Sequence, residues 1–379
     1  MKTVGIICEY NPFHNGHKKQ IDTIRAKFGP DCAIVCLMSG NFVQRGAPAI
    51  FHKSLRAQAA IMSGADLVLE LPLTYALSSA EGFATGGVKI LGGFCDALCF
   101  GAETGSLETL TAAAEALLSP AFRDALREQL AQGVSFPVAR AAALKEHSAL
   151  LQKPNDILAV EYCKAILSQK SALLPMTILR QGDYHDTAPD TDNPSATAIR
   201  NLLQSGEDWR CFVPEEAHSI FCNAPLYSLA VGERAILARL RCMTDEEFET
   251  LPYGSEGLWR KFMHACRNQD SIENIIAATK SKRYTRTRID RMLMCAYLGI
   301  TKDMLTQPAP YTRVLALNDT GRAVLKKARL SGQFPHVGEA MDDSYWALEQ
   351  RAADLYALFR ESSPAPAGQE SKQRVFYKE

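Results

Sequence analysis

The segment that decides the fold runs from residue 3 to residue 20 and reads Thr3-Val4-Gly5-Ile6-Ile7-Cys8-Glu9-Tyr10-Asn11-Pro12-Phe13-His14-Asn15-Gly16-His17-Lys18-Lys19-Gln20. Its apolar start predicts a buried strand, and the residues from Gly16 onward predict the first turn of a helix. His14 and His17 therefore lie where a strand ends and a helix begins. In a parallel sheet this junction is the ligand crevice, and a helix N-terminus offers N–H groups and a positive dipole to an anion. We infer a nucleotide site there.

A metal site is the main alternative interpretation of the two histidines. No third His or Cys stands at ligand spacing nearby, which disfavours zinc. The eleven cysteines are an odd number and many lie in apolar runs, which favours reduced, buried thiols. The CxxxC spacings at 32/36 and 95/99 are better explained by core positions than by metal binding. We therefore expect no metal ligands among the side chains.

Composition sets the broad class of the protein. A chain of 379 residues with 22% charged residues is typical of a globular protein with two domains. The formal net charge is zero, so any affinity for nucleic acid must come from a local patch. No apolar run reaches the roughly 20 residues that span a bilayer, and Met1-Lys2-Thr3 leads directly into a strand. We expect a cytoplasmic protein with no membrane partner.

The first half of the chain alternates strand-like and helix-like segments, which predicts an α/β fold. Alternation of this kind implies a Rossmann-like doubly wound parallel sheet, here over residues 1–206. The expected strands are at 4–8, 32–38, 66–70, 97–100 and 175–179. Residues 207–361 predict a mainly α-helical second domain, with one short strand at 314–317. The tail at 362–379 is rich in Ser, Pro and Ala, and its composition predicts disorder.

A second phosphate-binding segment follows the fifth expected strand. It reads Ser195-Ala196-Thr197-Ala198-Ile199-Arg200 and is predicted to open a helix capped by Ser195. Two hydroxyls and a guanidinium at a helix N-terminus suit the β- and γ-phosphates of a nucleotide.

Polar residues recur at the other expected strand ends and helix starts. The segments are the loop 40–46 with Lys53 and Arg56, then Glu70, Gly101, Asn155 and Arg180. Because the carboxyl ends of parallel strands meet at one edge of the sheet, these residues are expected to gather around one site.

Two segments are similar to signatures of the HIGH-type nucleotidyltransferases. The segment with His14 and His17 resembles [FY]-[DN]-P-x-H-x-G-H, and the segment from Ser195 to Arg200 resembles [ST]-[ST]-T-x-[IL]-R. Ala196 stands where that family has a hydroxyl residue. With the additional segments, nearly the whole chain resembles the tRNA(Met) cytidine acetate ligase family. This resemblance implies that ATP is bound by Ile7, Cys8, Glu9, Tyr10, Asn11, Pro12, Phe13, His14, Asn15, Gly16, His17, Lys18, Lys19, Gln20, Gly101, Asn155 and Arg180.

The resemblance also implies a reaction in two steps. Acetate attacks the α-phosphate of ATP to give acetyl-adenylate, and the exocyclic amine of the wobble cytidine in elongator tRNA(Met) then takes the acetyl group. Acetate is ionised near neutral pH, so the first step needs positioning and charge stabilisation rather than a general base. We assign that catalytic role to His14 and His17, and contact with the leaving pyrophosphate to Ser195, Thr197 and Arg200. Mg²⁺ is expected on the phosphates, and Lys53 and Gln44 are candidates for the acetate pocket.

A tRNA partner needs a cationic surface. The densest basic stretch of the chain lies between residues 280 and 291, with Tyr284 for stacking and Asp290 as its one acid. A solvated helix face is the alternative interpretation. The candidate RNA-binding residues are Lys280, Lys282, Arg283, Arg286, Arg288 and Arg291.

Two other functions stay open on the sequence alone. The same two signatures would serve an adenylyltransferase that makes a nucleotide-containing cofactor. They would also fit a non-catalytic RNA-binding protein regulated by ATP, although both histidines and Arg200 are retained.

Overall fold

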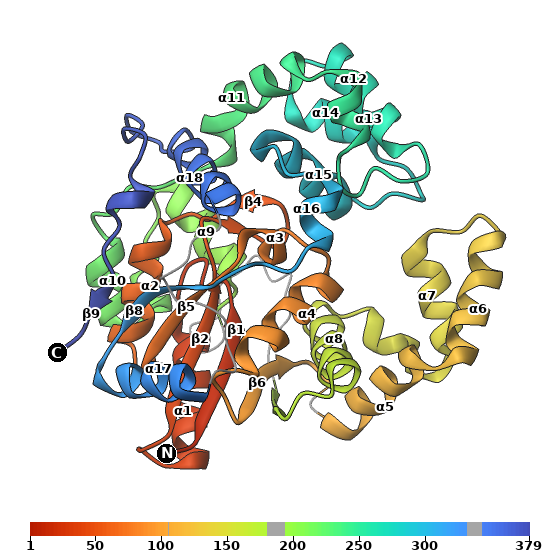
Figure 1. The fold of residues 1–379 in the computed structure, drawn as a ribbon. Coiled ribbons are helices and arrows are strands. Elements are labelled where there is room, and N and C mark those ends of the chain that lie inside the picture. The colour runs from red at the N-terminus through yellow and green to blue at the C-terminus, as the bar shows by residue number, and fades with distance from the viewer. Residues whose placement is uncertain (105, 180–193, 332–342) are drawn as a thin grey trace.

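A seven-stranded sheet forms the centre of the molecule (Figure 1). The structure is a computed structural model and describes residues 1–104, 106–179, 194–331 and 343–379. The strand order is β7-β6-β1-β2-β5-β8-β9. The strands are β1 (Thr3–Cys8), β2 (Ala33–Ser39), β5 (Leu67–Leu71), β6 (Ala97–Ala102), β7 (Leu174–Leu179), β8 (Arg313–Leu317) and β9 (Phe376–Tyr377), and a separate hairpin pairs β3 (Phe42–Val43) with β4 (Ala47–Pro48).

Helices cover both faces of the sheet, as the alternating pattern predicts. The side chains of β2 alternate between the two cores: Ile34, Cys36 and Met38 face one, and Val35 and Leu37 face the other. The first core is closed by α1 (Asn15–Phe28), α2 (Lys53–Met62), α9 (Ala196–Ser205) and α10 (Glu215–Phe221). The second is closed by α4 (Ala80–Leu91), α5 (Leu107–Leu118), α8 (Pro154–Gln169) and α17 (Asp319–Ser331). The predicted doubly wound α/β fold is confirmed.

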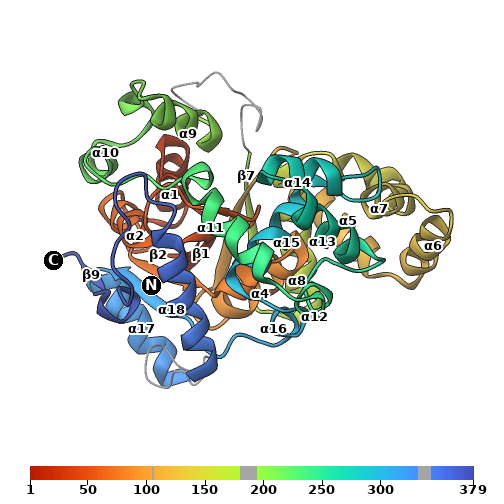
Figure 2. The same cartoon turned by 90° about the horizontal axis from the view of Figure 1, so that it is seen from above.

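The helices after α10, except α17, form a third core above the carboxyl ends of the strands (Figures 1 and 2). They pack on Phe42, Leu73 and Leu77, which follow β2 and β5. A mainly helical second half is therefore confirmed, and it lies against the edge of the sheet where the predicted site is. Its helices are α11 (Leu229–Cys242), α12 (Asp245–Glu249), α13 (Leu258–Asn268), α14 (Ile272–Thr279), α15 (Arg286–Leu298), α16 (Lys302–Thr306) and α18 (Asp343–Ala357).

The remaining elements are short or peripheral. A one-turn helix, α3 (Leu73–Ala76), follows β5, and α6 (Pro120–Ala131) and α7 (Phe136–Leu144) project from the side of the sheet that carries α5 (Figure 1). The 3₁₀ helices are η1 (Lys145–Leu151), η2 (Arg210–Phe212) and η3 (Glu370–Lys372).

The C-terminal tail departs from the expectation. Composition predicts disorder over 362–379, but this is wrong: the tail forms η3 and β9, and β9 pairs with β8 in the main sheet. β8 in turn runs antiparallel to β5. Strands from the far end of the chain thus complete the sheet begun in residues 1–206, and the division of the chain at 206 stays a prediction.

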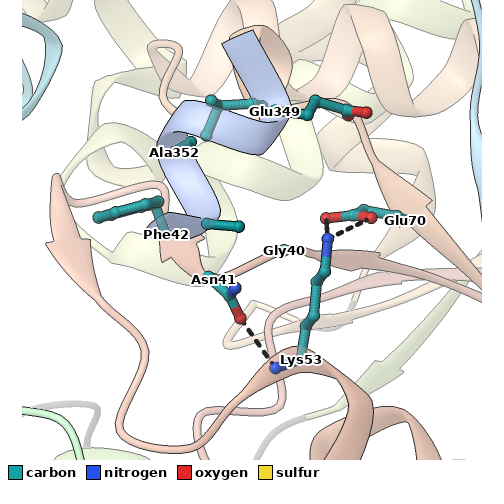
Figure 3. A pocket seen from close by; sticks show the side chains of 9 residues that line it. Gly40, Asn41, Phe42, Lys53, Glu70, Glu349 and Ala352 are labelled. Carbon is teal, nitrogen blue, oxygen red and sulfur yellow. Dashed lines mark hydrogen bonds and ion pairs between the residues drawn. The ribbon is translucent and has the colours of Figure 1, made fainter. Parts of the chain in front are cut away.

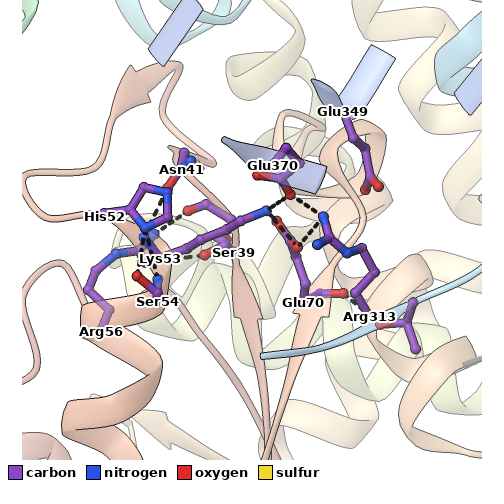
Figure 4. A network of polar contacts seen from close by, with 12 residues as sticks. Ser39, Asn41, His52, Lys53, Ser54, Arg56, Glu70, Arg313, Glu349 and Glu370 are labelled. Atoms are coloured by element: carbon purple, nitrogen blue, oxygen red, sulfur yellow. Dashed lines mark hydrogen bonds and ion pairs between the residues drawn. The ribbon is translucent and has the colours of Figure 1, made fainter. Parts of the chain in front are cut away.

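A buried charge network explains why the tail is ordered (Figure 4). Glu370 is 2% exposed, and its carboxylate pairs with the Lys53 ammonium and the Arg313 guanidinium. Lys53 also pairs with Glu70 at the end of β5, with Nζ 2.7 Å from Oε1. Burial raises the pKa of Glu370, but the charges of Lys53 and Arg313 outweigh it and hold that pKa below its usual value. Composition cannot reveal such a partner, because the two cations lie far away in the sequence.

Replacing Glu370 with alanine is expected to lower the free energy of unfolding by about 3–5 kcal/mol, because two buried cations would share the single carboxylate of Glu70. The lowered pKa means that this stabilisation is present above the unfolded-state pKa of about 4.3 and is lost as the pH falls through the folded-state value. Urea unfolding at pH 7 measures the effect. Glu361→Ala, at an exposed carboxylate just before the tail, is the matched control. An equal, small effect of both substitutions would contradict the role of Glu370.

Candidate active site

The two histidines occupy the junction between β1 and α1. His14 caps α1, and its Nδ1 accepts a hydrogen bond from the Gly16 N–H at 3.1 Å. The Nδ1 of His17 accepts from the His14 N–H at 3.2 Å, and the two rings stack with centroids 3.7 Å apart. Since each Nδ1 is an acceptor, the proton of each neutral ring is on Nε2. Both rings therefore offer an Nε2–H donor at a helix N-terminus, which suits a phosphate oxygen.

The residues around the histidines fix their rings. A Cβ at Gly16 would lie 3.0 Å from Cε1 of His14, so a larger residue would crowd the ring and require it to shift. Tyr10 is in the left-handed region with φ 46° and, with Phe13, packs on the His17 ring at centroid distances of 4.7 and 5.6 Å. The signature thus supplies both the donors and the packing that orients them.

The second predicted segment contacts the first directly. Ser195 caps α9, and its Oγ accepts from the Ala198 N–H at 3.0 Å. Arg200 donates to the Asn11 carbonyl at 2.8 Å and to Thr197 Oγ1 at 3.0 Å. Residues separated by nearly two hundred positions therefore meet in one place, as the sequence predicts for a shared triphosphate.

Two further predicted ATP contacts lie on one flank of this site. Gly101 is near the end of β6, which is the neighbour of β1. Glu103, two residues later, accepts from Asn155 Nδ2 at 2.6 Å, and Asp156 accepts from the Glu103 N–H at 2.8 Å. This reciprocal pair ties the end of β6 to the start of α8 and so brings Gly101 and Asn155 together. Arg180 lies outside the described residues.

The other carried-over positions of the first loop have mixed surroundings. The side chains of Cys8 and Phe13 are buried, whereas Lys19 is exposed. Asn15 donates to the Cys211 carbonyl at 2.9 Å, and Lys18 pairs with Asp22.

Arg56 is one of the residues that the sequence places at this edge of the sheet, and the structure gives it a connecting role that the sequence does not indicate. It is fully buried on α2, and its guanidinium donates to four backbone carbonyls. The acceptors belong to three separate loops, at Glu9, at Ser39 and Gly40, and at Phe51. Nothing in the sequence around Arg56 indicates that its side chain connects the histidine loop to the neighbouring loops.

Glu9 is the carboxylate nearest the histidine signature. Its Oε1 accepts from the Gln44 N–H at 2.7 Å. Burial raises the pKa of Glu9, and the Gln44 N–H and nearby arginines partly offset this. Gln44 therefore links the histidine loop to the β3–β4 hairpin.

In the folded protein, arginines of the predicted RNA-binding stretch form ion pairs with acidic residues. Arg283 pairs with Glu256 at 2.9 Å, and Arg286 pairs with Glu273 and, at 3.5 Å, with Asp290. The six candidate RNA-binding residues therefore fall into two groups. Lys280 and Lys282 are exposed lysines. The four arginines have intramolecular contacts, namely Arg283, Arg286, Arg288 and Arg291.

Tyr284, Arg288 and Arg291 serve the packing of the helical half. Tyr284 is buried rather than available for stacking, and its hydroxyl donates to the Glu256 carbonyl at 3.1 Å. Arg288 donates to the Tyr253 carbonyl at 2.9 Å, and Arg291 lies over the Tyr253 ring. Tyr253 itself donates to the Leu77 carbonyl beside the site.

The residues that the structure describes contain no group of three or more His, Cys, Asp or Glu side chains placed to hold a metal ion. Within the same ranges, every helix is too short or too polar to cross a bilayer.

Comparison with known proteins places this arrangement in a family. The HIGH Nucleotidyl Transferase pattern matches residues 1–372. A tRNA(Met) cytidine acetate ligase of Alkaliphilus metalliredigens is 37% identical, with 94% of each chain covered, and one of Anoxybacillus flavithermus is 36% identical, with 99% of this chain and 98% of that protein covered.

Two crystal structures of Thermotoga maritima TmcAL are also similar, each at 30% identity over the whole of this chain. The apo form gives a TM-score of 0.92 with 99% of that chain covered, and the form bound with alpha-thio ATP gives 0.90 with 100% covered. With both signatures in contact at the carboxyl edge of the sheet, and with full-length relatives well above 30% identity, the chain belongs to the tRNA(Met) cytidine acetate ligase family of HIGH nucleotidyltransferases.

Proposed function

We propose that this protein is an ATP-dependent ligase that acetylates the wobble cytidine of elongator tRNA(Met) to N4-acetylcytidine. The observation that carries the proposal is the contact between Arg200 and the Asn11 carbonyl, which puts the second signature against the first. The names of the full-length relatives, and the ATP analogue bound to the Thermotoga maritima protein, support the same substrates.

In the first step, an acetate oxygen attacks the α-phosphorus of ATP, and the bond to the bridging oxygen of pyrophosphate breaks. The Nε2–H groups of His14 and His17 stabilise the charge that builds on the phosphate oxygens. Ser195, Thr197 and Arg200 hold the leaving pyrophosphate at the N-terminus of α9. Because acetate is already an anion, these residues supply position and charge rather than a base.

In the second step, the cytidine N4 amine attacks the acetyl carbonyl, AMP leaves, and one amine proton is released. Mg²⁺ neutralises charge on the phosphates when it is bound. Since the described residues offer no cluster of carboxylates for it, phosphate oxygens and water would be its principal ligands.

Transfer of labelled acetate tests the proposal. The protein is incubated with ATP and labelled acetate, with and without tRNA(Met), and the nucleosides are then separated. We expect label in N4-acetylcytidine only when ATP and tRNA are both present. Label on AMP that never reaches tRNA would leave a general adenylating enzyme or an adenylyltransferase for another acceptor, and no label anywhere would favour a non-catalytic protein.

The helical half is proposed to hold the tRNA, and the exposed lysines before α15 are the residues to test. Changing Lys280 and Lys282 together to glutamate is expected to weaken tRNA binding at least tenfold at low salt and to flatten its salt dependence, because two phosphate contacts become repulsive. ATP affinity should not change. The matched control is Lys326→Glu with Lys327→Glu, at an exposed pair on α17. Equal loss in both double variants would indicate an effect of net charge instead of a local contact.

A further inference from the structure

A small hollow lies where β2 and β5 end, and none of the residues assigned to the first reaction step lines it (Figure 3). It contains about 300 Å³ of atom-free space, a volume that includes the open solvent at its mouth. Its lining combines polar side chains with an apolar wall, namely Asn41, Glu70 and Glu349 with Phe42, Leu73 and Ala352.

The hollow adjoins the loop that carries the histidines. Its floor follows β2 and β5, the strands that succeed β1 on the side opposite β6. Arg56 donates both to the Glu9 carbonyl of the histidine loop and to the Gly40 carbonyl in the lining. Gly101 and Asn155 lie on the β6 side of the histidine loop, and the hollow lies on the opposite side.

Two buried polar groups in the lining are only partly satisfied. Asn41 is 6% exposed, and its Oδ1 accepts from the Lys53 N–H at 2.9 Å. Glu349 is 7% exposed, and its Oε2 accepts from the Tyr311 hydroxyl at 2.7 Å. Among the residues that the structure describes, neither Asn41 Nδ2 nor Glu349 Oε1 has a hydrogen-bond partner in the protein. Neither atom is among the fully buried polar atoms that lack a partner, so both are accessible from the hollow and can bind a ligand that supplies one acceptor and one donor.

The charge of the lining argues against an anion. Among the described residues, Lys53 and Arg313 are both already paired with Glu370 and, at 2.7 and 3.8 Å, with Glu70. The guanidinium of Arg56 is committed to backbone carbonyls. Glu349 adds a third carboxyl group. Acetate or a phosphate would meet these carboxylates without an unpaired cation to compensate, so Lys53 is a poor candidate for the acetate pocket.

The carboxyl group of Glu349 suits a neutral ligand. Burial, followed by the nearby charge of Glu70, raises the pKa of Glu349 to about 7. Both protonation states are therefore accessible near neutral pH, and a neutral, amine-bearing ring is compatible with either.

We propose that this hollow receives the cytosine base that is to be acetylated, with Asn41 Nδ2 donating to its ring nitrogen or carbonyl oxygen and Glu349 Oε1 accepting from its amino group. Enzymes that modify a base take it out of the stack and read its Watson–Crick edge in a pocket of this kind. Phe42, Leu73 and Ala352 supply the apolar wall for the ring. The inference rests on the proposed function and adds the residues that select cytosine.

Base discrimination in binding tests this assignment. The probes are two full-length tRNA(Met) transcripts that carry cytosine or uracil at the target position. Uracil presents a donor and an acceptor where cytosine presents the reverse, so the unsubstituted protein is expected to bind the cytosine transcript at least about tenfold more tightly.

Asn41→Asp is the informative variant, because it keeps the oxygen that accepts from the Lys53 N–H and replaces the donor with an acceptor. We expect the ratio of cytosine to uracil binding to fall to near one and kcat/KM for tRNA to fall at least tenfold. Acetate-dependent ATP–pyrophosphate exchange, which needs no base, should proceed at the rate of the unsubstituted protein. Glu349→Gln is the second variant, with the same expected loss of discrimination. Asn223→Asp, an equal change of charge at an exposed position, is the control.

The contrary results are distinct. An unchanged ratio of cytosine to uracil transcript binding in both variants would overturn the assignment. A variant with a higher KM for acetate and an unchanged KM for tRNA would also overturn it. An unsubstituted protein that binds both transcripts equally would overturn it too. Failure of the unsubstituted protein to acetylate tRNA at all would reject the proposed function itself, and this is seen before any variant is made.

Discussion

Replacement of His14 or His17 by alanine is expected to lower the rate of acetate-dependent ATP–pyrophosphate exchange by at least about a hundredfold. Both rings have Nδ1 committed to backbone N–H groups, so each holds its Nε2–H in a fixed direction. Such preorganised donors stabilise charge that develops on the phosphate without reorganising during the reaction. The loss should appear in the rate of exchange more than in the affinity for ATP.

A capping substitution separates catalysis from folding. His14→Asn keeps a side-chain acceptor at the N-cap of α1 and removes the Nε2–H donor, and asparagine is among the best N-cap residues. We expect it to retain stability and to lose exchange activity as alanine does. His264→Ala, at an exposed histidine on α13, is the control. Full exchange activity in His14→Asn would mean that the ring only caps the helix.

Replacement of Arg56 by methionine is expected to lower the free energy of unfolding by about 3–5 kcal/mol. The guanidinium is fully buried, and its removal leaves four carbonyls in three loops without their donor. Because one of these carbonyls is that of Glu9, the histidine loop should also shift, and exchange activity should fall even where the protein is folded. Urea unfolding and exchange kinetics on the same sample measure the two effects.

Arg127→Met provides the comparison for this substitution. Arg127 lies on α6 with its side chain 83% exposed, so its replacement should change stability by less than about 0.5 kcal/mol. A similar, small effect at Arg56 would show that the loops keep their arrangement without the guanidinium.

The sequence predicted those features of the fold that depend on residues close together in the chain. Hydrophobic runs and their spacing located β1, β2, β5, β6 and β7 to within one or two residues. Ser195 is a helix cap because a serine hydroxyl can accept from the N–H groups that open a helix, and this depends on neighbours in the chain alone.

Features that depend on distant partners could not be predicted. Glu370 is ordered by Lys53 and Arg313, which lie more than 300 and more than 50 positions away. Arg56 serves carbonyls whose positions are set only when three loops fold. The stretch around Arg283 and Arg286 looks free of acids until Glu256 and Glu273 pack against it. For Glu370 and Arg56 the deciding energy is that of a buried charge with partners remote in sequence, whereas the pairs of Arg283 and Arg286 are exposed.

The most direct measurement is a crystal structure of this protein with alpha-thio ATP, the analogue already seen with the Thermotoga maritima relative. We predict the α-phosphate at the Nε2 atoms of His14 and His17, and the β- and γ-phosphates at the N-terminus of α9, beside Ser195, Thr197 and Arg200. Phosphates bound away from either loop, or two loops that separate when the analogue binds, would contradict the account.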